Sequence, residues 1–399
     1  MKIFVSAGEV SGDVHGSYLV KELKKLKPDA VFFGLGGEKL AEAGVDIRFN
    51  ITRRGSIGIL EALPNIIPIF SVFQKVKKLL LQEKPDLVIL IDSQGINFPI
   101  ANFCKKIGLK TVYYIAPQEW LWGTPRGVKK VADAVGLIVA IFEREYESYK
   151  KAGANVIFFG HPLIDIVNPS PNGSTGLRRD QSSRSPSQPS RALPRDSHLP
   201  TPNVISLCPG SRTHEIKNLL PILLKSAELI QKEIPDAHFI IPAASHDSYK
   251  IINSFICNLS FDICHLQALE SASYDALASS TLALCTSGTI NLEASLLGTP
   301  NIMIYKLSPL TYWIGKHILK IDKKLKYFSM PNILLDKKVI PELVMADANP
   351  EKIAAEALSI LKYPDRSAKM KASFEQLKTL LGAPGVIAKT AKAILSLSF

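Results

Sequence analysis

The chain has 399 residues, more than one ordinary domain core accommodates, so its length predicts two domains. Its composition, 46% hydrophobic and 21% charged, excludes a disordered or fibrous protein. The net charge of +12 predicts an acidic partner, namely nucleic acid, an anionic membrane surface or a phosphorylated substrate. Because the positive charge is spread along the chain and forms no dense basic arm, it argues against nucleic acid.

Neither a metal site nor an export signal is expected. The five cysteines form no C-x-x-C pair and are expected to be free thiols in a reducing cytosol. The eight histidines lack the spacing of metal ligands, so we expect no metal and no cofactor. The apolar start, residues 1–5, is too short for a signal peptide, and no run of about eighteen apolar residues occurs. The sequence therefore predicts a cytoplasmic protein.

Short apolar runs alternate with amphipathic stretches along residues 1–167. The runs end at turn-forming residues and predict strands at 3–7, 31–35, 87–91, 111–115, 137–142 and 156–159. Helical patterns lie between them, for example at 16–26 and 99–107. Fully apolar strands separated by helices indicate a parallel sheet covered on both faces, so 1–167 is expected to form one Rossmann-like domain.

The alternation stops at residues 168–203, which are rich in Ser, Pro and Arg and are expected to form a disordered linker. Strands are again predicted at 204–207, 239–241, 282–285 and 301–305, and helix from Pro350 onward. Residues 204–399 are therefore expected to form a second Rossmann-like domain with C-terminal helices. The predicted fold class is α/β, with two doubly wound domains facing a cleft that binds ligands at the carboxyl ends of the strands.

The segment 8–13, which reads GEVSGD, joins the first predicted strand to the first helix. It is not G-x-G-x-x-G and so does not indicate a dinucleotide site. The carboxylates of Glu9 and Asp13 would repel a phosphate and suit sugar hydroxyls better. The alternative is that Ser11 or Asp13 only caps the helix.

Asp92 directly follows the apolar run 87–91. A carboxylate at this strand end points into the expected cleft, where it would take a proton from an attacking hydroxyl. The alternative is that Asp92 caps the helix that follows.

Two turns of the second domain favour a phosphate site. The segment 209–212, PGSR, lies between a strand and a helix, so its amides and Arg212 can bind phosphate oxygens, although ordinary turns look similar. The segment 286–289, TSGT, is followed one helical turn later by Glu293, which can accept both hydroxyls of a ribose. No D-x-D element occurs, so Arg212 and helix N-termini would have to meet the diphosphate charge without a metal.

Two apolar stretches beside lysines, 57–81 and 305–327, favour contact with an anionic membrane surface. The residues expected to contact lipid or acyl chains are Ile59, Leu63, Ile66, Ile67, Phe70 and Phe73. The alternatives are an ordinary buried helix for the first stretch and a solvated edge for the second.

Six motifs in order along the chain resemble those of the lipid-A-disaccharide synthase family, which are inverting GT-B glycosyltransferases. They lie at 7–13, 91–97, 160–162, 209–212, 287–293 and 330–332. The resemblance implies condensation of UDP-2,3-diacylglucosamine with 2,3-diacylglucosamine 1-phosphate. The products would be the β(1→6) disaccharide 1-phosphate of lipid A and UDP. It also implies peripheral association with the cytoplasmic face of the inner membrane.

The resemblance further implies roles for the motif residues. Asp92 would be the general base on the 6-hydroxyl of the acceptor. The residues expected to bind the UDP part of the donor are Gly210, Ser211, Arg212, Ser287, Gly288, Thr289, Glu293 and Asn332. The residues expected to bind the acceptor are Glu9, Ser11, Asp13, Asn97 and His161. The first domain would thus bind the acceptor and the second the UDP-sugar.

The chain departs from the family pattern in two places. Gly95 stands where the family usually has a second acid, and the linker replaces the stretch before Pro209. Two other interpretations stay open. One is another UDP-sugar enzyme of the same fold, either a UDP-N-acetylglucosamine 2-epimerase, which the apolar segment 57–81 disfavours, or a peptidoglycan-precursor transferase. The other is a non-catalytic basic module, which would leave Asp92 and the 287–293 turn without a purpose.

Overall fold

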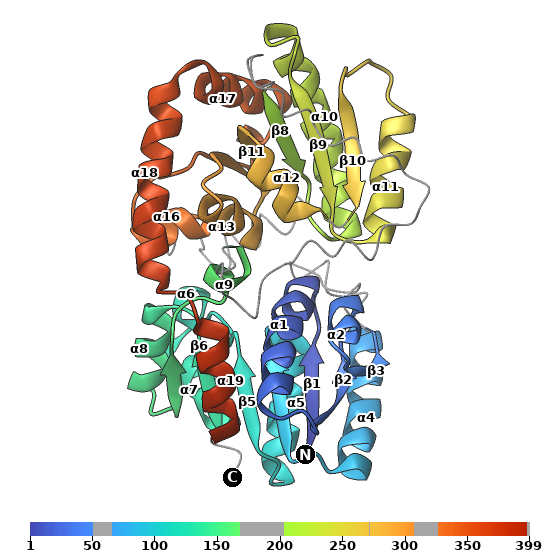
Figure 1. Cartoon of the computed structure of the whole chain (residues 1–399), viewed down its shortest axis with the longest axis vertical. Helices are drawn as coiled ribbons and strands as arrows, with labels where there is room; N and C mark the ends of the chain where they lie inside the picture. Colours follow the sequence, from blue (N-terminus) through green and yellow to red (C-terminus); the bar gives the residue numbers. More distant parts are fainter. Residues whose placement is uncertain (51–65, 168–202, 271, 307–325, 397–399) are drawn as a thin grey trace.

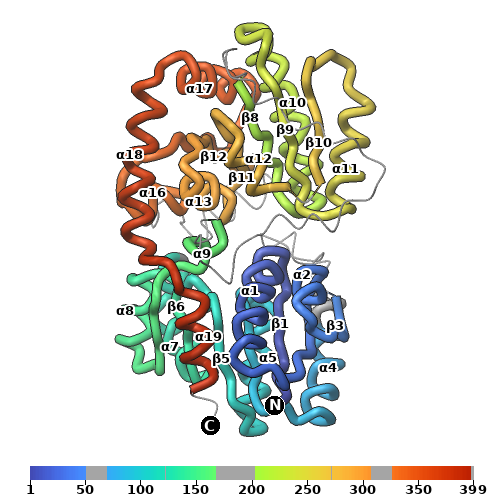
Figure 2. The backbone as a smooth tube through the Cα atoms, in the orientation of Figure 1, coloured from blue at the N-terminus to red at the C-terminus, as the bar shows by residue number. Residues whose placement is uncertain are grey.

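The computed structural model describes residues 1–50, 66–167, 203–270, 272–306 and 326–396. Within these ranges the chain forms two α/β halves that lie one above the other along the long axis (Figure 1). Figure 2 shows that the chain passes between the halves at the green α9 segment and again near the red C-terminal end. The predicted linker lies outside the described residues except for Asn203.

A parallel sheet of seven strands forms the N-terminal half, in the order β3-β2-β1-β4-β5-β6-β7. The strands are β1 (Lys2–Ala7), β2 (Val31–Leu35), β3 (Asp46–Phe49), β4 (Leu87–Ile91), β5 (Thr111–Tyr114), β6 (Leu137–Ala140) and β7 (Val156–Phe158). The six predicted strands are confirmed, with small shifts at their ends. Only β3 was missed, because this edge strand alternates charged and apolar residues and has no continuous apolar run.

Helices cover both faces of this sheet, as predicted. Successive residues of β1 point to opposite faces, so Val5 packs in one core and Phe4 in the other. The Val5 face carries α1 (Val10–Leu26), α2 (Glu38–Glu42) and α19 (Val386–Ser396). The Phe4 face carries α4 (Ile66–Glu83), α5 (Gln94–Lys106) and α7 (Pro125–Ala134). The short helices of this half are α6 (Glu119–Trp122), α8 (Glu143–Lys151) and α9 (Leu163–Val167).

A parallel sheet of six strands forms the C-terminal half, in the order β10-β9-β8-β11-β12-β13. The strands are β8 (Val204–Cys208), β9 (His238–Ala243), β10 (Leu266–Glu270), β11 (Leu282–Thr286), β12 (Asn301–Tyr305) and β13 (Glu342–Val344). The four predicted strands are confirmed. The two edge strands were missed, because β10 carries polar residues and β13 has three residues.

The helices of this half flank its sheet on both faces (Figure 1). They are α10 (Thr213–Glu233), α11 (His246–Cys257), α12 (Ser273–Ser279), α13 (Thr289–Leu296), α16 (Met330–Leu335), α17 (Pro350–Lys362) and α18 (Pro364–Leu381). The helical pattern predicted from Pro350 onward is therefore confirmed.

The C-terminal helices do not all stay in the second half. α18 lies beside the second sheet, whereas α19 packs into the core of the first (Figure 1). The Asp165 carboxylate in α9 accepts hydrogen bonds from the amides of Gly385 (2.6 Å) and Ile387 (2.8 Å), and so caps the start of α19. The division expected from the sequence assigned all C-terminal helices to the second domain and did not foresee this crossing.

Candidate active site

Asp92 directly follows β4 and has a backbone conformation that is uncommon for a residue with a side chain. The φ angle is +52° at Asp92 and +48° at Ser93, both in the left-handed region. Such strain persists only where surrounding contacts enforce it, and it is typical of functional sites. Burial raises the pKa of Asp92, while hydrogen bonds from the Ser93 amide and the Ser11 hydroxyl oppose this shift. The N-cap position of α5 belongs to Ser93, so Asp92 is not the cap of that helix.

Three side chains hold the Asp92 turn in place. Asn97 Nδ2 and Tyr113 Oη each donate a hydrogen bond of 2.9 Å to the Asp92 carbonyl oxygen. Ser11 Oγ donates to Asp92 Oδ2 at 3.1 Å. Asn97 is fully buried, and its Oδ1 also accepts from Ser6 Oγ at 2.5 Å. Asn97 therefore positions the Asp92 backbone, and backbone carbonyls occupy its amide hydrogens, which leaves it no donor for the acceptor-binding role expected from the sequence.

An ion pair joins the two halves of the molecule beside Asp92. Arg212, at the N-cap of α10, donates from Nη2 to Glu9 Oε2 in the first half and from Nη1 to Glu215 Oε1 at 2.7 Å. The Arg212 side chain is 17% exposed and that of Glu9 29%. Burial and the nearby charge of Asp92 raise the pKa of Glu9, whereas the Arg212 guanidinium lowers it. The structure thus brings the predicted donor-site arginine, one predicted acceptor residue and Asp92 together.

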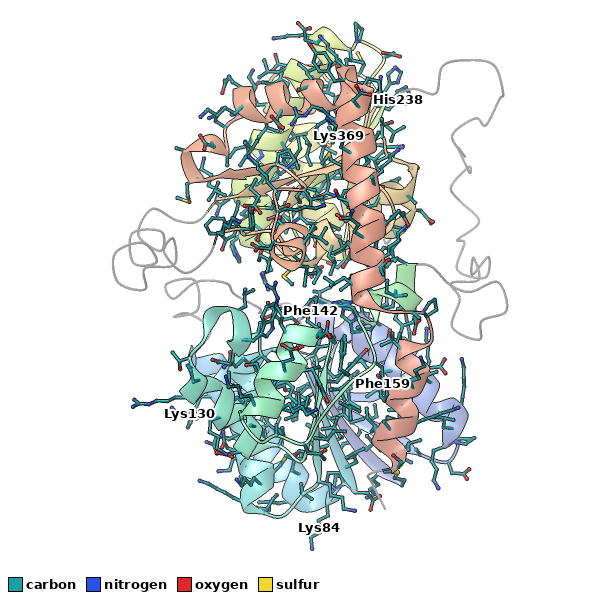
Figure 3. All side chains as sticks on the ribbon, turned by 90° about the vertical axis from the view of Figure 1, so that its left-hand side faces the viewer. Lys84, Lys130, Phe142, Phe159, His238 and Lys369 are labelled. Carbon is teal, nitrogen blue, oxygen red and sulfur yellow. The ribbon has the colours of Figure 1, made fainter. Side chains whose placement is uncertain are left out.

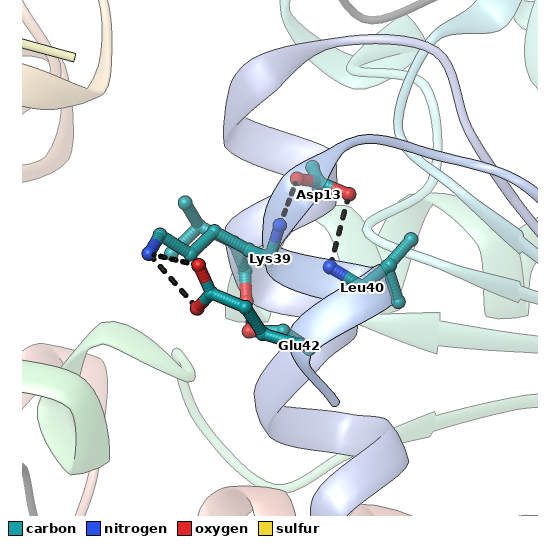
Figure 4. A network of polar contacts seen from close by, with 6 residues as sticks. Asp13, Lys39, Leu40 and Glu42 are labelled. Atoms are coloured by element: carbon teal, nitrogen blue, oxygen red, sulfur yellow. Dashed lines mark hydrogen bonds and ion pairs between the residues drawn. The ribbon is translucent and has the colours of Figure 1, made fainter. Parts of the chain in front are cut away.

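Asp13 lies in α1 but caps a different helix, α2. Its carboxylate is 4% exposed and accepts hydrogen bonds from the amides of Gly37 (2.6 Å), Lys39 (2.9 Å) and Leu40 (3.3 Å). Figure 4 shows the carboxylate turned toward the start of α2. Because these amides belong to the N-terminal turn of α2, Asp13 stabilises that helix from α1. The geometry favours the capping alternative over acceptor binding for this residue.

The turns after β8 and β11 lie side by side, because these two strands pair directly. Each contains a glycine in the left-handed region, Gly210 (φ +113°) and Gly288 (φ +131°). A Cβ on Gly210 would lie 2.3 Å from Glu215 Oε2, so both the backbone and the space require glycine there. Ser211 and Ser287 occupy these turns, directly before α10 and α13. Both helix starts therefore present backbone amides at the same edge of the sheet.

Glu293 lies one turn into α13. Burial raises its pKa to about 7, and a hydrogen bond with the Thr289 side chain opposes the shift. Tyr274 in α12 has a raised pKa. Burial is the largest cause, followed by the charge of Glu293 and then by Tyr18 of α1. Tyr274 therefore lies between the predicted ribose carboxylate and Tyr18 of the first half. Among the described residues, no three His, Cys, Asp or Glu side chains are grouped to hold a metal ion.

Asn332, predicted to bind the donor, lies in α16, and its side chain is hydrogen-bonded to the loop that follows this helix. Its side chain is fully buried. Its Nδ2 donates to Ile340 O (2.9 Å) and Glu342 Oε1 (2.8 Å), and its Oδ1 accepts from the amides of Val339 (2.7 Å) and Ile340 (2.9 Å). Two donors and two acceptors are all that this amide offers. In this structure Asn332 therefore stabilises the loop and has no group left for a ligand.

His161 lies where the chain crosses between the halves. Its amide donates to Leu381 O at 2.8 Å, and its Nδ1 accepts from the Leu163 amide at 3.1 Å. The ring is buried, 5.0 Å from the Phe142 ring and 6.2 Å from that of His15. Figure 3 shows Phe142 at the junction of the two halves. Burial lowers the pKa of His161, so the ring is neutral and packs as part of the crossing.

The residues predicted to contact lipid lie on or before α4. Ile59 and Leu63 lie outside the described residues, as does most of the 305–327 stretch, and Ile66 and Ile67 begin α4. Phe70 is 61% exposed, whereas Phe73 is half-buried and packs against the core on that face. No helix in the described ranges is long and apolar enough to cross a bilayer.

The sequence analysis missed Glu145, a fully buried residue of α8. Its Oε2 accepts hydrogen bonds from the amides of Ile141 (2.8 Å) and Phe142 (3.3 Å), and its Oε1 has no partner among the described residues. Burial raises its pKa to about 8, and the charge of Asp92 contributes to the shift. The available signal was a glutamate three residues after the N-cap of a predicted helix, which is a capping-box position.

Two Rossmann-like sheets, with a strained aspartate just beyond a strand of one and two glycine-containing turns at the same edge of the other, define the GT-B class of fold. Solved structures agree on the fold. The UDP-GlcNAc 2-epimerase of Neisseria meningitidis bound to UDP-GlcNAc aligns over 100% of this chain and 99% of that chain, with a TM-score of 0.63 and 15% identity. At this identity the likeness establishes the fold alone.

The chain belongs to the lipid-A-disaccharide synthetase family, whose model matches residues 3–395. The lipid-A-disaccharide synthase of Syntrophus aciditrophicus is 36% identical to it, over 99% of this chain and 97% of the relative. That of Gloeothece citriformis is also 36% identical, over 99% of both chains. The family resemblance predicted from the six motifs is confirmed, and the alternative of another UDP-sugar enzyme is not favoured.

Proposed function

We propose that the chain condenses UDP-2,3-diacylglucosamine with 2,3-diacylglucosamine 1-phosphate at the site around Asp92, giving the β(1→6) disaccharide 1-phosphate of lipid A and UDP. The observation that carries this assignment is the enforced left-handed turn at Asp92, close to the Glu9–Arg212 ion pair between the halves. Membership of the family supports the reaction. The geometry supports the residues assigned to it.

Asp92 acts as the general base. Its carboxylate removes the proton of the acceptor 6-hydroxyl as that oxygen attacks the anomeric carbon, and UDP leaves with the electrons of the broken bond. Attack from the opposite face inverts the anomeric configuration. Ser11 orients the carboxylate through its hydrogen bond, and Asn97 and Tyr113 fix the backbone. Burial raises the pKa of Asp92, which makes the carboxylate a stronger base than an exposed one.

The second half binds the UDP part of the donor. The turns at 210–211 and 287–288 present amides at the starts of α10 and α13, whose positive ends stabilise the diphosphate. Arg212 adds a charge-assisted hydrogen bond. Glu293 accepts hydrogen bonds from the ribose hydroxyls when it is ionised. Thr289 holds the Glu293 side chain in place.

The face formed by α4, α5 and α7 contacts the anionic surface of the inner membrane on its cytoplasmic side. α4 exposes Phe70 on this face, and Figure 3 shows Lys130 of α7 on the outer surface of the same half. The exposed cations of the three helices are Lys75, Lys78, Lys105, Lys106, Arg126, Lys129 and Lys130. An apolar anchor beside cations fits an interface of anionic lipid. Because both substrates carry acyl chains, this contact brings the protein to them.

The reaction is tested by incubating the protein with both lipid substrates in the presence of EDTA and detecting the products by mass spectrometry. We expect the disaccharide 1-phosphate and UDP in equal amounts. UDP binding without product would refute the acceptor assignment and leave the donor site in place. Turnover of UDP-N-acetylglucosamine without any acceptor would support an epimerase instead.

A further inference from the structure

Arg212 is engaged in this structure, although its proposed role requires it to meet the donor. Glu215 accepts from Nη1 at 2.7 Å and from the Arg212 amide at 3.4 Å, so it anchors the arginine from within α10. Glu9 accepts from Nη2 and comes from the opposite half of the molecule. The guanidinium is therefore held by one carboxylate from its own helix, Glu215, and by one from the other half of the molecule, Glu9.

Among the described residues, the Glu9 side chain forms no hydrogen bond within its own half, unlike the side chain of its neighbour Asp13. It occupies the N-cap of α1, but its side chain makes no capping hydrogen bond. Asp13, by contrast, is bound by three amides of α2. Glu9 also lies near Asp92, a second carboxylate, so a partly buried negative charge at this place needs a cation beside it. Arg212 supplies that cation.

We propose that Arg212 exchanges partners when the donor binds: Glu9 holds it across the cleft in the free protein, and the diphosphate of the UDP-sugar displaces Glu9. A diphosphate carries more negative charge than one carboxylate and offers the guanidinium several acceptors in a plane. Glu215 keeps the arginine in position during the exchange. The released Glu9 carboxylate, beside Asp92, then accepts from the acceptor hydroxyls. This inference rests on the proposed donor site.

Competition between Glu9 and the donor predicts that loss of the Glu9 contact tightens UDP binding. We expect calorimetry to give a Kd for UDP about two- to fivefold lower in Glu9→Gln than in the wild type, the size of effect typical of one partly exposed ion pair. Turnover should fall in the same variant, because the acceptor loses a hydrogen-bonding carboxylate. A glutamate that only bound the acceptor would leave the Kd of UDP unchanged.

Two further variants separate partner exchange from simple charge repulsion. Glu9→Asp keeps the charge but is one methylene shorter, so it loses the contact with Arg212. Asp92→Asn removes a neighbouring negative charge without breaking any hydrogen bond to Arg212. Partner exchange predicts tighter UDP binding in Glu9→Asp and little change in Asp92→Asn. Repulsion alone predicts the reverse and would overturn the proposal.

A matched control is a substitution of Glu215, the carboxylate in α10 that holds Arg212. Glu215→Gln should weaken UDP binding, because Arg212 loses the residue that positions it. UDP affinity that is the same in the wild type, Glu9→Gln and Glu9→Asp would overturn the exchange and leave the donor site intact. A wild-type protein that does not bind UDP at all would refute the proposed function instead.

Discussion

The buried Glu145 makes the stability of the first half depend on pH. The folded protein holds the proton of this carboxyl up to about pH 8, whereas the unfolded chain releases it near its ordinary pKa of 4.5. Between these values the unfolded state binds fewer protons, so stability is complete below about pH 4.5 and is lost as the pH rises toward 8. Each pH unit costs about 1.4 kcal/mol, which amounts to roughly 3 kcal/mol by pH 7 and about 5 kcal/mol by pH 9.

Glu145→Gln tests this reasoning directly. The amide oxygen can accept the same two backbone hydrogen bonds, and the side chain cannot ionise. We expect the difference in free energy of unfolding between variant and wild type to move in favour of the variant by several kcal/mol between pH 5 and pH 9. Urea titrations followed by tryptophan fluorescence measure this difference. Glu143→Gln, at an exposed position of the same helix, controls for the loss of one negative charge. A Glu145→Gln difference that stays constant with pH would refute a neutral, buried carboxyl.

Four other variants test the site and the surface. Asp92→Asn should lower kcat by about 10²–10⁴-fold with an unchanged melting temperature, because asparagine also adopts the left-handed backbone; near-normal turnover would remove Asp92 from the mechanism. Wild-type UDP affinity should rise about tenfold from pH 6 to pH 8 as Glu293 ionises, and Glu293→Gln should lose that part of the pH dependence; equal profiles would exclude the ribose role. Gly95→Asp should raise the free energy of unfolding by about 0.5–1 kcal/mol, because it adds an acid with free space around it to the first turn of α5; a lower midpoint in urea would contradict this. Phe70→Glu should weaken flotation with vesicles of anionic lipid and leave UDP binding unchanged; full flotation would place the contact elsewhere.

Most of the strands that could be predicted are buried on both faces; the half-buried edge strand β7 was also predicted, because its residues are all apolar. β1, β4 and β11 are continuous apolar runs, and such a run identifies a central parallel strand without knowledge of its neighbours. β3 and β10 carry charged or polar residues, as is typical of strands at the end of a sheet, and among the described residues each pairs with one other strand. Their pairing depends on the strand beside them, which lies elsewhere in the sequence.

The candidate site likewise contains residues that local sequence predicts and residues whose role depends on their partners in the fold. Asp92, Arg212 and Glu293 were predicted as site residues because each lies in the turn after a central strand or in the first turns of the helix that follows, and that position is local information. Asn97 and Asn332 are polar residues of two of the six motifs, but backbone groups from nearby loops use all or most of their hydrogen-bonding capacity. A sequence shows that a polar side chain is present; it does not show which amide or carbonyl will reach it first.

The contact between Glu9 and Arg212 could not be predicted from the sequence for the same reason. The two residues are 203 positions apart, and each appears in its own motif as a ligand for a substrate. Only the stacking of the two halves brings them together. The sequence therefore predicted two binding surfaces that face each other, but it did not indicate which residues of the two would be in contact.

The placement of α19 has a consequence for the order in which the protein is made. Ile387, Ala391 and Ile394 complete the core that also contains Ile3 and Val5, so the N-terminal half is finished only after the C-terminal half has been translated. Until the codons for α19 are translated, the face of the sheet that α19 covers stays open to solvent. A stop codon placed between α18 and α19 therefore damages the N-terminal half and leaves the second half whole.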